Sequence, residues 1–306
     1  MPRMHALLLH SPSAGEGGPS KDRLLDLFRR QGFDPSCVSV KDPGIVEVLA
    51  QPHDLVVAVG GDGTVTRVLT HMQDRTIPVA ILPQGTANNI ARSLGITGSS
   101  ESLIAGLRDA REQRFDIGAA IGPWGRHRFV EAVGLGLLAR GMAEIDATDI
   151  SGEEQLICSR RKFGRLLMEA EPECLKMTVD GQELTGDFLV LEIMNISHVG
   201  PNLNLAPKAD PGDGLLDVVY APVDRRAALL DWLNGDGKCG GEGGDPPVEV
   251  IRAARVEITW AGTSLRLGDN FSPAPRAVGK LTVELEPQSA RILIPRTSAT
   301  VEFRND

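Results

Sequence analysis

The 306-residue sequence has no long hydrophobic run. No segment reaches the roughly 18 apolar residues that a membrane-spanning helix requires. Residues Met1 to Leu9 are too short for a secretory signal peptide and lack a cleavage-site pattern. We therefore expect a cytoplasmic protein without a transmembrane segment. Peripheral contact with the inner face of the membrane stays open.

Cysteine and histidine are few and scattered. The four cysteines show no CxxC spacing, and the six histidines form no HExxH pair. These absences argue against a zinc site. Free thiols in a reducing compartment are the simplest interpretation.

Positive charge is also in short supply. The formal net charge is −9, from 32 basic and 41 acidic residues. Nucleic acid is therefore excluded as an expected partner, because phosphate backbones need a basic surface. The same charge limits contact with an anionic membrane to something local and transient. A hydrophobic content of 42% is that of an ordinary globular protein, and the length suffices for two domains.

No GxxxxGK[ST] P-loop occurs, so any phosphate site must use other loops. The apolar run Leu55 to Val59 ends in the sequence GGDGT, Gly60 to Thr64, and a helical pattern follows. A second run, Ile77 to Leu82, ends in PQGTANN, Pro83 to Asn89, before another helical pattern. These patterns predict two consecutive strand–loop–helix units.

Both loops have the chemistry of a phosphate site. Adjacent glycines allow positive φ and close approach of a ligand, and the next helix directs its free N–H groups at the loop. A carboxylate at Asp62 would repel a polyphosphate unless it binds Mg²⁺ or accepts a proton. Tight turns with ordinary helix caps are the alternative for each loop. The candidate nucleotide ligands are Gly60, Gly61, Gly63, Thr64, Gly85, Thr86 and Asn88.

Together the two motifs resemble the catalytic domain of the diacylglycerol kinase family, which includes bacterial lipid kinases and sphingosine kinases. GGDGT alone is shared with NAD kinases and, more loosely, with phosphofructokinases. The second motif favours the lipid branch. The resemblance implies ATP and Mg²⁺ as cofactors. It also implies a lipid hydroxyl as phosphoryl acceptor, in diacylglycerol or a related lipid presented at a membrane surface.

A third loop follows the first apolar run, His5 to His10. Its sequence from Ser11 resembles the Asn-Pro-x-Ser-Gly motif of the family, with Ser11 in place of Asn and Ala14 between Ser and Gly. Ser13 and Gly15 are therefore further candidate nucleotide ligands. A flexible Ser/Gly loop is the alternative.

The chain divides into two parts. Strands alternate with helices over residues 1–122, which predicts an α/β domain with a Rossmann-like parallel sheet whose ligands lie beyond the carboxyl ends of the strands. Its last expected helix covers Ser99 to Glu112. Residues 291–306 resemble the family's terminal strands, which return to this first domain.

Residues 123–290 read as short strands between turns and predict an all-β antiparallel sandwich on the lipid side of the site. The first expected strand is Phe129 to Val133. A helix over Glu153 to Ala170 carries Arg160, Arg161 and Arg165 on one face. That basic face could meet a lipid headgroup, or the helix could dock on its own domain.

The turn from Asp210 to Asp217 is rich in oxygen ligands, which suit a hard cation. It resembles the DGLLD segment of the family, and this resemblance implies a structural Mg²⁺ held by Asp213, the Leu215 carbonyl and Asp210. The alternative is a turn whose Pro, Gly and Asp residues serve backbone geometry.

The family's proton acceptor lies in an Asp-Gly-Glu sequence at a strand end. Here the matching strand ends Gly268-Asp269-Asn270-Phe271, and phenylalanine can neither accept a proton nor bind a metal. Asp269 and Asp62 are therefore the expected catalytic residues. Two other functions stay open: an NAD kinase-like enzyme with a soluble substrate, and a catalytically weakened nucleotide- or lipid-binding regulator. Homodimer formation also stays open.

Overall fold

The structure is a computed structural model that describes residues 3–11, 18–139, 141, 152–234, 244–260, 264–268, 270–272 and 279–296. It forms two compact units, Met1–Phe115 with Gln288–Asp306, and Asp116–Pro287. The boundary therefore precedes the position expected from sequence, because strand β6 (Gly118–Gly122) pairs with β18 (Gly279–Leu285) in the second unit.

The first unit contains one six-stranded sheet in the order β2-β1-β3-β4-β19-β5. Strand β19 pairs parallel to β4 and antiparallel to β5. The returning chain thus joins the first unit as expected, whereas residues 297–306 lie outside the described residues. The strands are β1 (Met4–His10), β2 (Phe33–Ser39), β3 (Leu55–Gly60), β4 (Val79–Pro83), β5 (Arg111–Phe115) and β19 (Ala290–Ile294).

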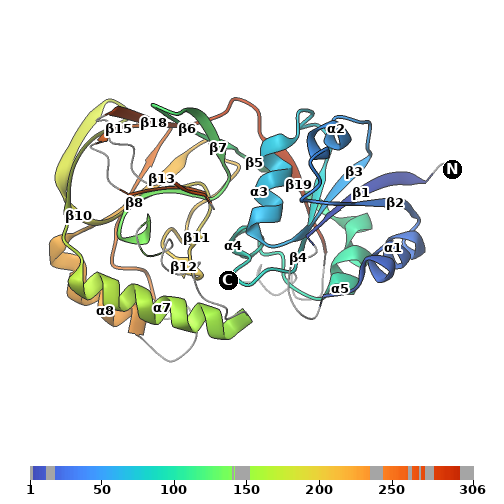
Figure 1. Ribbon diagram of the computed structural model, residues 1–306, viewed down its shortest axis with the longest axis horizontal. Coiled ribbons are helices and arrows are strands. Elements are labelled where there is room, and N and C mark those ends of the chain that lie inside the picture. Colours follow the sequence, from blue (N-terminus) through green and yellow to red (C-terminus); the bar gives the residue numbers. More distant parts are fainter. Residues whose placement is uncertain are drawn as a thin grey trace. The chain divides into compact units, whose positions relative to one another are not determined.

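Helices cover both faces of this sheet. Helices α1 (Lys21–Arg30) and α5 (Ser100–Ala105) lie on one face, and α3 (Asp62–His71) lies on the other (Figure 1). The connection from β1 leads to β2 in one direction, and that from β3 leads to β4 in the other. Right-handed crossovers then require opposite faces for α1 and α3. The strand order reverses between β1 and β3, which is where such sheets bind ligands.

The helix expected over Ser99 to Glu112 was predicted too long. Helix α5 ends at Ala105, the turn η1 (Gly106–Asp109) follows, and Glu112 lies in β5. At Gly106 the chain packs against the returning segment, since its carbonyl accepts the N–H of Arg296 at 3.3 Å. A Cβ at Gly106 would overlap the Arg296 carbonyl. Tertiary pairing with β19 thus overrides local helix propensity.

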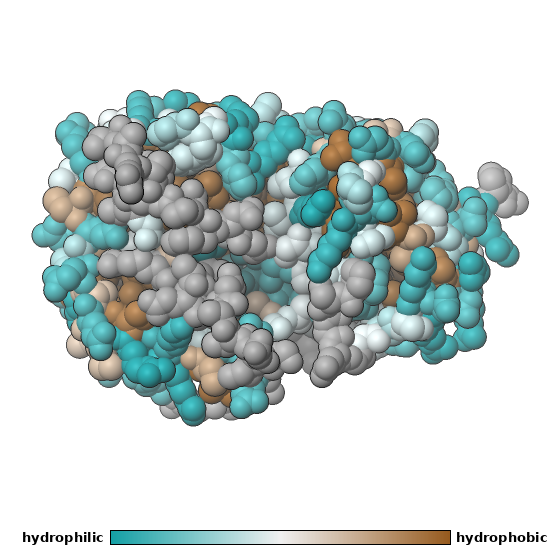
Figure 2. All heavy atoms as spheres, in the orientation of Figure 1, coloured by the Kyte–Doolittle hydropathy of each residue, from teal (hydrophilic) through white to brown (hydrophobic). Residues whose placement is uncertain are grey.

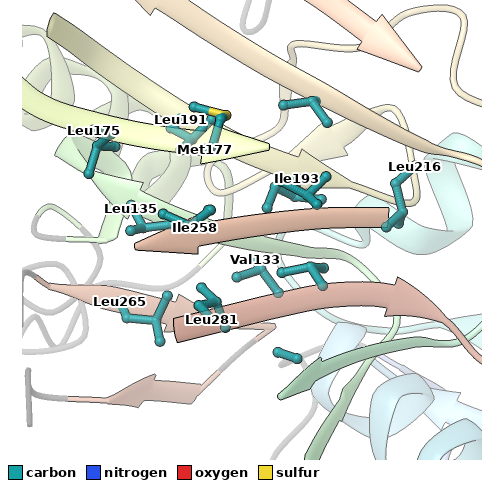
Figure 3. Packing of buried hydrophobic residues seen from close by; sticks show 14 of the residues in the cluster. Val133, Leu135, Leu175, Met177, Leu191, Ile193, Leu216, Ile258, Leu265 and Leu281 are labelled. Carbon is teal, nitrogen blue, oxygen red and sulfur yellow. The ribbon is translucent and has the colours of Figure 1, made fainter. Parts of the chain in front are cut away.

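The second unit is the expected antiparallel β-sandwich, built on an eleven-stranded sheet in the order β17-β16-β8-β10-β9-β15-β18-β6-β7, with β13 on β10 and β14 on β13. Its main core contains Val133, Ile193 and Ile258 from three different strands (Figure 3). The remaining strands are β7 (Gly125–Phe129), β8 (Ala132–Gly136), β9 (Glu173–Val179), β10 (Gln182–Met194), β13 (Leu216–Pro222), β14 (Glu249–Ala253), β15 (Arg255–Trp260), β16 (Leu265–Leu267) and β17 (Asn270–Ser272), while β11 (His198–Val199) pairs separately with β12 (Leu203–Asn204).

The expected strand Phe129 to Val133 is two strands in the structure. Phe129 ends β7, which pairs with β6, whereas Val133 belongs to β8, which pairs with β10 and β16. The apolar run continues where the chain crosses from β7 to β8, so the hydrophobic pattern does not show where one strand ends and the next begins. The sequence patterns also did not predict strands β6 and β14.

Helix α7 (Gly152–Glu169) matches the expected amphipathic helix. Phe163 and Leu167 are buried in a second core with Leu229 of α8 (Arg226–Asn234). Arg160 donates from Nε to the Pro201 carbonyl at 2.7 Å, so this residue points into its own unit. Arg161 and Arg165 are exposed. The helix therefore docks on its own unit with part of its basic face in solvent.

No helix in the described part of the chain has the length and apolar character needed to span a bilayer. Figure 2 shows hydrophilic residues over most of the coloured surface on this face, with hydrophobic residues in small separate patches. The three cysteines among the described residues, Cys37, Cys158 and Cys174, are free thiols.

Candidate active site

The N-terminus of α3 forms the centre of the candidate site. Strand β3 ends at Gly60, Gly61 is the N-cap, and no side chain caps the helix. The first N–H groups of a helix have no acceptor one turn earlier in the helix, although the Thr64 N–H here donates to the Gly61 carbonyl. Together with the helix dipole they form a site suited to an anion such as a phosphate.

Close approach between the two glycine loops explains why these positions need glycine. A Cβ on Gly85 would lie 2.5 Å from the Gly61 Cα, and one on Gly60 would overlap the Thr64 side chain. None of these three glycines has positive φ, so the sequence argument from positive φ was wrong for them. The absence of a side chain lets the loops touch, and it leaves the backbone accessible.

Thr64 and Gly63 lie in the first turn of α3. The Thr64 side chain is buried against Gly60, and its N–H donates to the Gly61 carbonyl at 2.9 Å. Thr64 therefore shapes the turn from within. Thr86 is half-buried in the second loop.

Asp62 links the two loops. Its Oδ2 accepts the N–H of Asn89 and its Oδ1 accepts the N–H of Ile90, both at 2.9 Å. These residues begin α4 (Asn89–Ser93), so the carboxylate caps the next helix. From the sequence we expected Mg²⁺ or a proton to offset the negative charge of Asp62. The structure shows a third group that offsets this charge, the N-terminus of α4.

Asn88 closes the second loop on itself. It adopts a left-handed conformation, with φ 51° and ψ 42°. Its Oδ1 accepts the Gly85 N–H at 2.9 Å, and its Nδ2 donates to the Gly85 carbonyl at 2.7 Å. Its amide group thus fixes the backbone that meets Gly61, and its part in holding a nucleotide stays a prediction.

Ser13 and Gly15 lie outside the described residues. Gly18, which follows them in the chain, approaches the Gln84 side chain in the second motif. The Gln84 Nε2 is buried and has no hydrogen-bond partner among the described residues. Sequence reasoning gave Gln84 no role, although it stands within the second motif. It is an additional candidate for contact with a nucleotide.

His10 ends β1 beside the switch point. Burial lowers the pKa of its imidazole, and the positive charge of Lys21 lowers this pKa further. The imidazole is therefore neutral at physiological pH and adds no positive charge to the strand end. A histidine in an apolar run gave no recognisable sequence signal for this position.

In the second unit, the predicted metal turn is held by internal contacts. Asp213 Oδ1 accepts the Leu215 N–H at 2.9 Å, and Oδ2 forms an ion pair with Arg252. Asp210 Oδ1 accepts the Gly212 N–H at 3.0 Å. A metal at Asp213 would therefore have to displace the Arg252 guanidinium. The metal site of Asp210, Asp213 and the Leu215 carbonyl stays a prediction.

Two buried residues that sequence reasoning missed support this turn. Asp116 Oδ2 accepts the Gly214 N–H at 2.9 Å, and its own N–H donates to the Pro211 carbonyl at 2.5 Å. Asn195 Nδ2 donates to the Asp116 carbonyl at 2.9 Å. A lone Asp and a lone Asn in apolar sequence gave no signal, because their partners lie far away along the chain.

The predicted catalytic Asp269 lies outside the described residues. It stands between β16 and β17, where Phe271 pairs with Arg266. Arg266 is 1% exposed. It donates to the Gly268 carbonyl at 3.0 Å and to Glu192 Oε2 at 2.5 Å. Burial raises the pKa of Glu192, although Arg266 acts in the opposite direction. This buried ion pair fixes the strand that leads to Asp269.

Comparison with known proteins is consistent with both units. Residues 5–120 match the diacylglycerol kinase catalytic domain, and residues 162–294 match the YegS C-terminal NAD kinase beta sandwich-like domain. A Mycobacterium tuberculosis protein named "Diacylglycerol kinase" is 26% identical over 82% of this chain and 80% of its own length.

A Pseudomonas putida protein named "Probable lipid kinase YegS-like" is 32% identical over 83% of this chain and 81% of its own length. A crystal structure of a diacylglycerol kinase from Bacillus anthracis has a TM-score of 0.64 at 19% identity. It covers 96% of this chain and 97% of the other, and it supports the fold.

Proposed function

The chain belongs to the diacylglycerol kinase catalytic domain family, and from that premise we propose that it transfers the γ-phosphoryl group of ATP to a hydroxyl group of diacylglycerol or a related lipid. Membership of this family supports a lipid kinase in general terms. The identities of the nucleotide, the metal and the particular lipid are what we propose.

The contact between Gly61 and Gly85 at the uncapped N-terminus of α3 is the observation that carries the proposal. Phosphoryl transfer depends mainly on positioning and on neutralising charge. The two loops meet with no side chain between their closest atoms, so backbone N–H groups are left to hold the phosphates. Mg²⁺ bound with the nucleotide would neutralise phosphate charge.

The proposal assigns different tasks to the polar residues of the first unit. Gly60, Gly61, Gly63 and Gly85 would leave room for the triphosphate, and Thr64, Thr86 and Asn88 would shape the loops around it. Ser13 and Gly15 would close the site from the loop after β1. Asp62 would hold the second loop in place through α4.

Asp269 and Asp62 are the two proposed acceptors of the lipid hydroxyl proton. Substitution of each by Asn tests them separately. Loss of turnover together with loss of the acid limb of the pH–rate profile supports proton acceptance. If Asp62→Asn lowers stability and leaves the shape of that profile unchanged, Asp62 serves only to hold α4.

The direct test of the function is an assay with ATP, Mg²⁺ and diacylglycerol in mixed micelles, with sphingoid bases and ceramide in the same panel. We expect a phosphorylated lipid from at least one substrate. No phosphorylated product across the panel, from protein that binds ATP, would refute a lipid kinase. Phosphorylation of NAD in parallel reactions would instead establish the NAD kinase-like alternative.

The regulator alternative is tested at Phe271, where the resemblance leads us to expect Glu. Phe271→Glu restores an acidic side chain on β17. A large gain in turnover would mean that the site has lost its proton acceptor during divergence. Unchanged turnover in an active enzyme would mean that Asp269 or Asp62 already performs this task.

A further inference from the structure

A pocket in the second unit is lined by none of the predicted site residues. Its volume is about 380 Å³, within the range of pockets that hold small molecules. The lining residues come from a loop after β12, from strands β13 and β14, and from the segment before β14. They are Leu205, Ala206, Pro207, Lys208, Asp217, Asp245, Pro246, Val248, Val250 and Arg252.

Asp217 is the unusual member of this set. It is 5% exposed, and its side chain forms no hydrogen bond or ion pair with any residue that the structure describes. Buried polar side chains in proteins nearly always have a partner. A carboxylate that is nine-tenths buried, lines a pocket and has no partner therefore indicates a ligand.

The strand pattern shows why Asp217 faces the pocket. Side chains alternate along β13, and Leu216 and Val218 belong to the sandwich core. Asp217 shares the opposite face with Val219, which packs in the second core with Leu205, Ala206 and Val248. An apolar side chain would suit this position. The acid instead places a carboxyl group on a mainly aliphatic wall.

The nearest cation is engaged elsewhere. Arg252 is the direct cross-strand neighbour of Asp217 in the pairing of β13 with β14. Its guanidinium nevertheless forms its ion pair with Asp213. Lys208, which also lines the pocket, forms no ion pair with a described residue. Asp217 thus keeps an uncompensated charge in spite of two basic neighbours.

The charges of the pocket favour a cation over an anion. Asp217 and Asp245 contribute two carboxylates, Lys208 contributes one positive charge, and the charge of Arg252 is offset by Asp213. A metal ion fits poorly, because no cluster of three or more suitable ligands occurs among the described residues. The aliphatic walls suit carbon atoms. Positive charge and an aliphatic body together describe an organic amine.

We propose that this pocket binds a small organic ammonium ion, with the charged nitrogen at Asp217 and the aliphatic part against Leu205, Val248 and Val250. A protonated amine would donate hydrogen bonds to the carboxylate and form an ion pair shielded from water. The proposal is independent of the kinase function. The same chemistry would serve a free amine or the ethanolamine headgroup of a lipid.

Calorimetric titration of the full chain with n-butylammonium chloride tests the proposal, with n-butanol and sodium butyrate as neutral and anionic probes. We expect saturable binding of the amine alone, weakened about tenfold or more in Asp217→Asn by loss of the charge pair. Asp224→Asn is the matched control, because Asp224 is an exposed acid outside the pocket, and it should bind as the native protein does.

Asp217→Asn conserves size and removes a buried charge, so the variant should fold. Its thermal transition and circular dichroism spectrum verify this.

A second experiment tests whether the amine is a lipid headgroup. It compares flotation of the protein with phosphatidylethanolamine vesicles and with phosphatidylcholine vesicles. Binding only to the ethanolamine vesicles, lost in Asp217→Asn, supports the headgroup as the source. Binding of neither amine, equal binding of butanol, preference for butyrate, or an unchanged affinity in Asp217→Asn would overturn the proposal.

Discussion

The glycine loops of the first unit and the charged residues of the second unit use opposite means to build a site. At Gly61 and Gly85 the side chain is missing, and the polar side chains nearby, Asp62 and Asn88, bond to the loop backbone. In the second unit, Arg252 and Arg266 reach carboxylates on other segments of the chain. The site in the first unit depends on backbone groups, and the arrangement in the second unit depends on pairs of charged side chains.

This difference decides how each unit should respond to substitution. In the first unit the useful groups are backbone N–H groups, so an added methyl group is the most damaging small change. In the second unit the arrangement depends on which charges pair, and at the Arg266–Glu192 pair removal of one partner leaves the other buried. Four substitutions test this distinction, from the largest expected effect to the smallest.

Arg266→Leu should have the largest effect. Glu192 is fully buried, and its carboxylate would lose the guanidinium that neutralises it. Breaking a buried pair in this way costs about 3–5 kcal/mol. Chemical denaturation of the native and variant proteins measures the loss of unfolding free energy.

Two further variants show whether charge is the cause. Adding Glu192→Leu to Arg266→Leu removes both charges, and we expect part of the stability to return. Arg225→Leu breaks an exposed ion pair with Glu249 and should cost less than about 1 kcal/mol. Equal losses in Arg225→Leu and Arg266→Leu would contradict the role of burial.

Gly85→Ala should have the next largest effect, and on activity. The new Cβ would lie 2.5 Å from the Gly61 Cα, so the two loops must separate. We expect kcat/KM to fall by about 100-fold, because positioning supplies most of the catalysis in phosphoryl transfer. Steady-state kinetics with ATP and the accepted lipid measure it. An active Gly85→Ala enzyme with unchanged ATP affinity would show that this contact does not form the nucleotide site.

The same contrast explains what the sequence could predict. The glycine loops were recognisable because all their determinants lie within about thirty residues, and their placement on consecutive parallel strands follows from the βαβ rule. The pairing of Arg252 with Asp213 and of Arg266 with Glu192 joins residues far apart in the chain. Neither local spacing nor composition contains that information.

Details within the recognised loops were also hidden from the sequence. The capping of α4 by Asp62 requires the second loop to turn back beside the first. Residues 129–133 read as one strand because apolar periodicity persists while the chain changes pairing partner. The antiparallel sandwich was predicted as a class, but the strand order within it depends on contacts that no single segment encodes.

Asp217→Asn should alter the pH dependence of stability. Burial raises the pKa of Asp217 to about 6 from an ordinary value of 3.8, so the folded state holds a proton that the unfolded state releases. Folding stability from this group is present at acid pH and is lost as pH rises from about 4 to about 6. At pH 8 the Asn variant should be more stable by about 1–3 kcal/mol, with little difference at pH 4.

Thermal unfolding at matched pH values measures this difference, and Asp224→Asn controls for the general effect of removing an acid. A variant that is less stable than the native protein at pH 8 would contradict an unpaired charge. It would indicate that the Asp217 carboxylate has a partner of opposite charge.

Gly164→Ala should have the smallest effect, a slight gain in stability. Gly164 lies inside α7, where a Cβ would meet nothing within 4 Å. Alanine is favoured over glycine in a helix interior by about 0.5–1 kcal/mol, so the unfolding free energy should rise by that amount. Kinase activity should not change, which makes this variant the matched control for Gly85→Ala. If both alanine substitutions reduced activity alike, the loss at Gly85 could not be assigned to the contact with Gly61. The proposed difference between a backbone site in the first unit and charge pairs in the second would then lose its support.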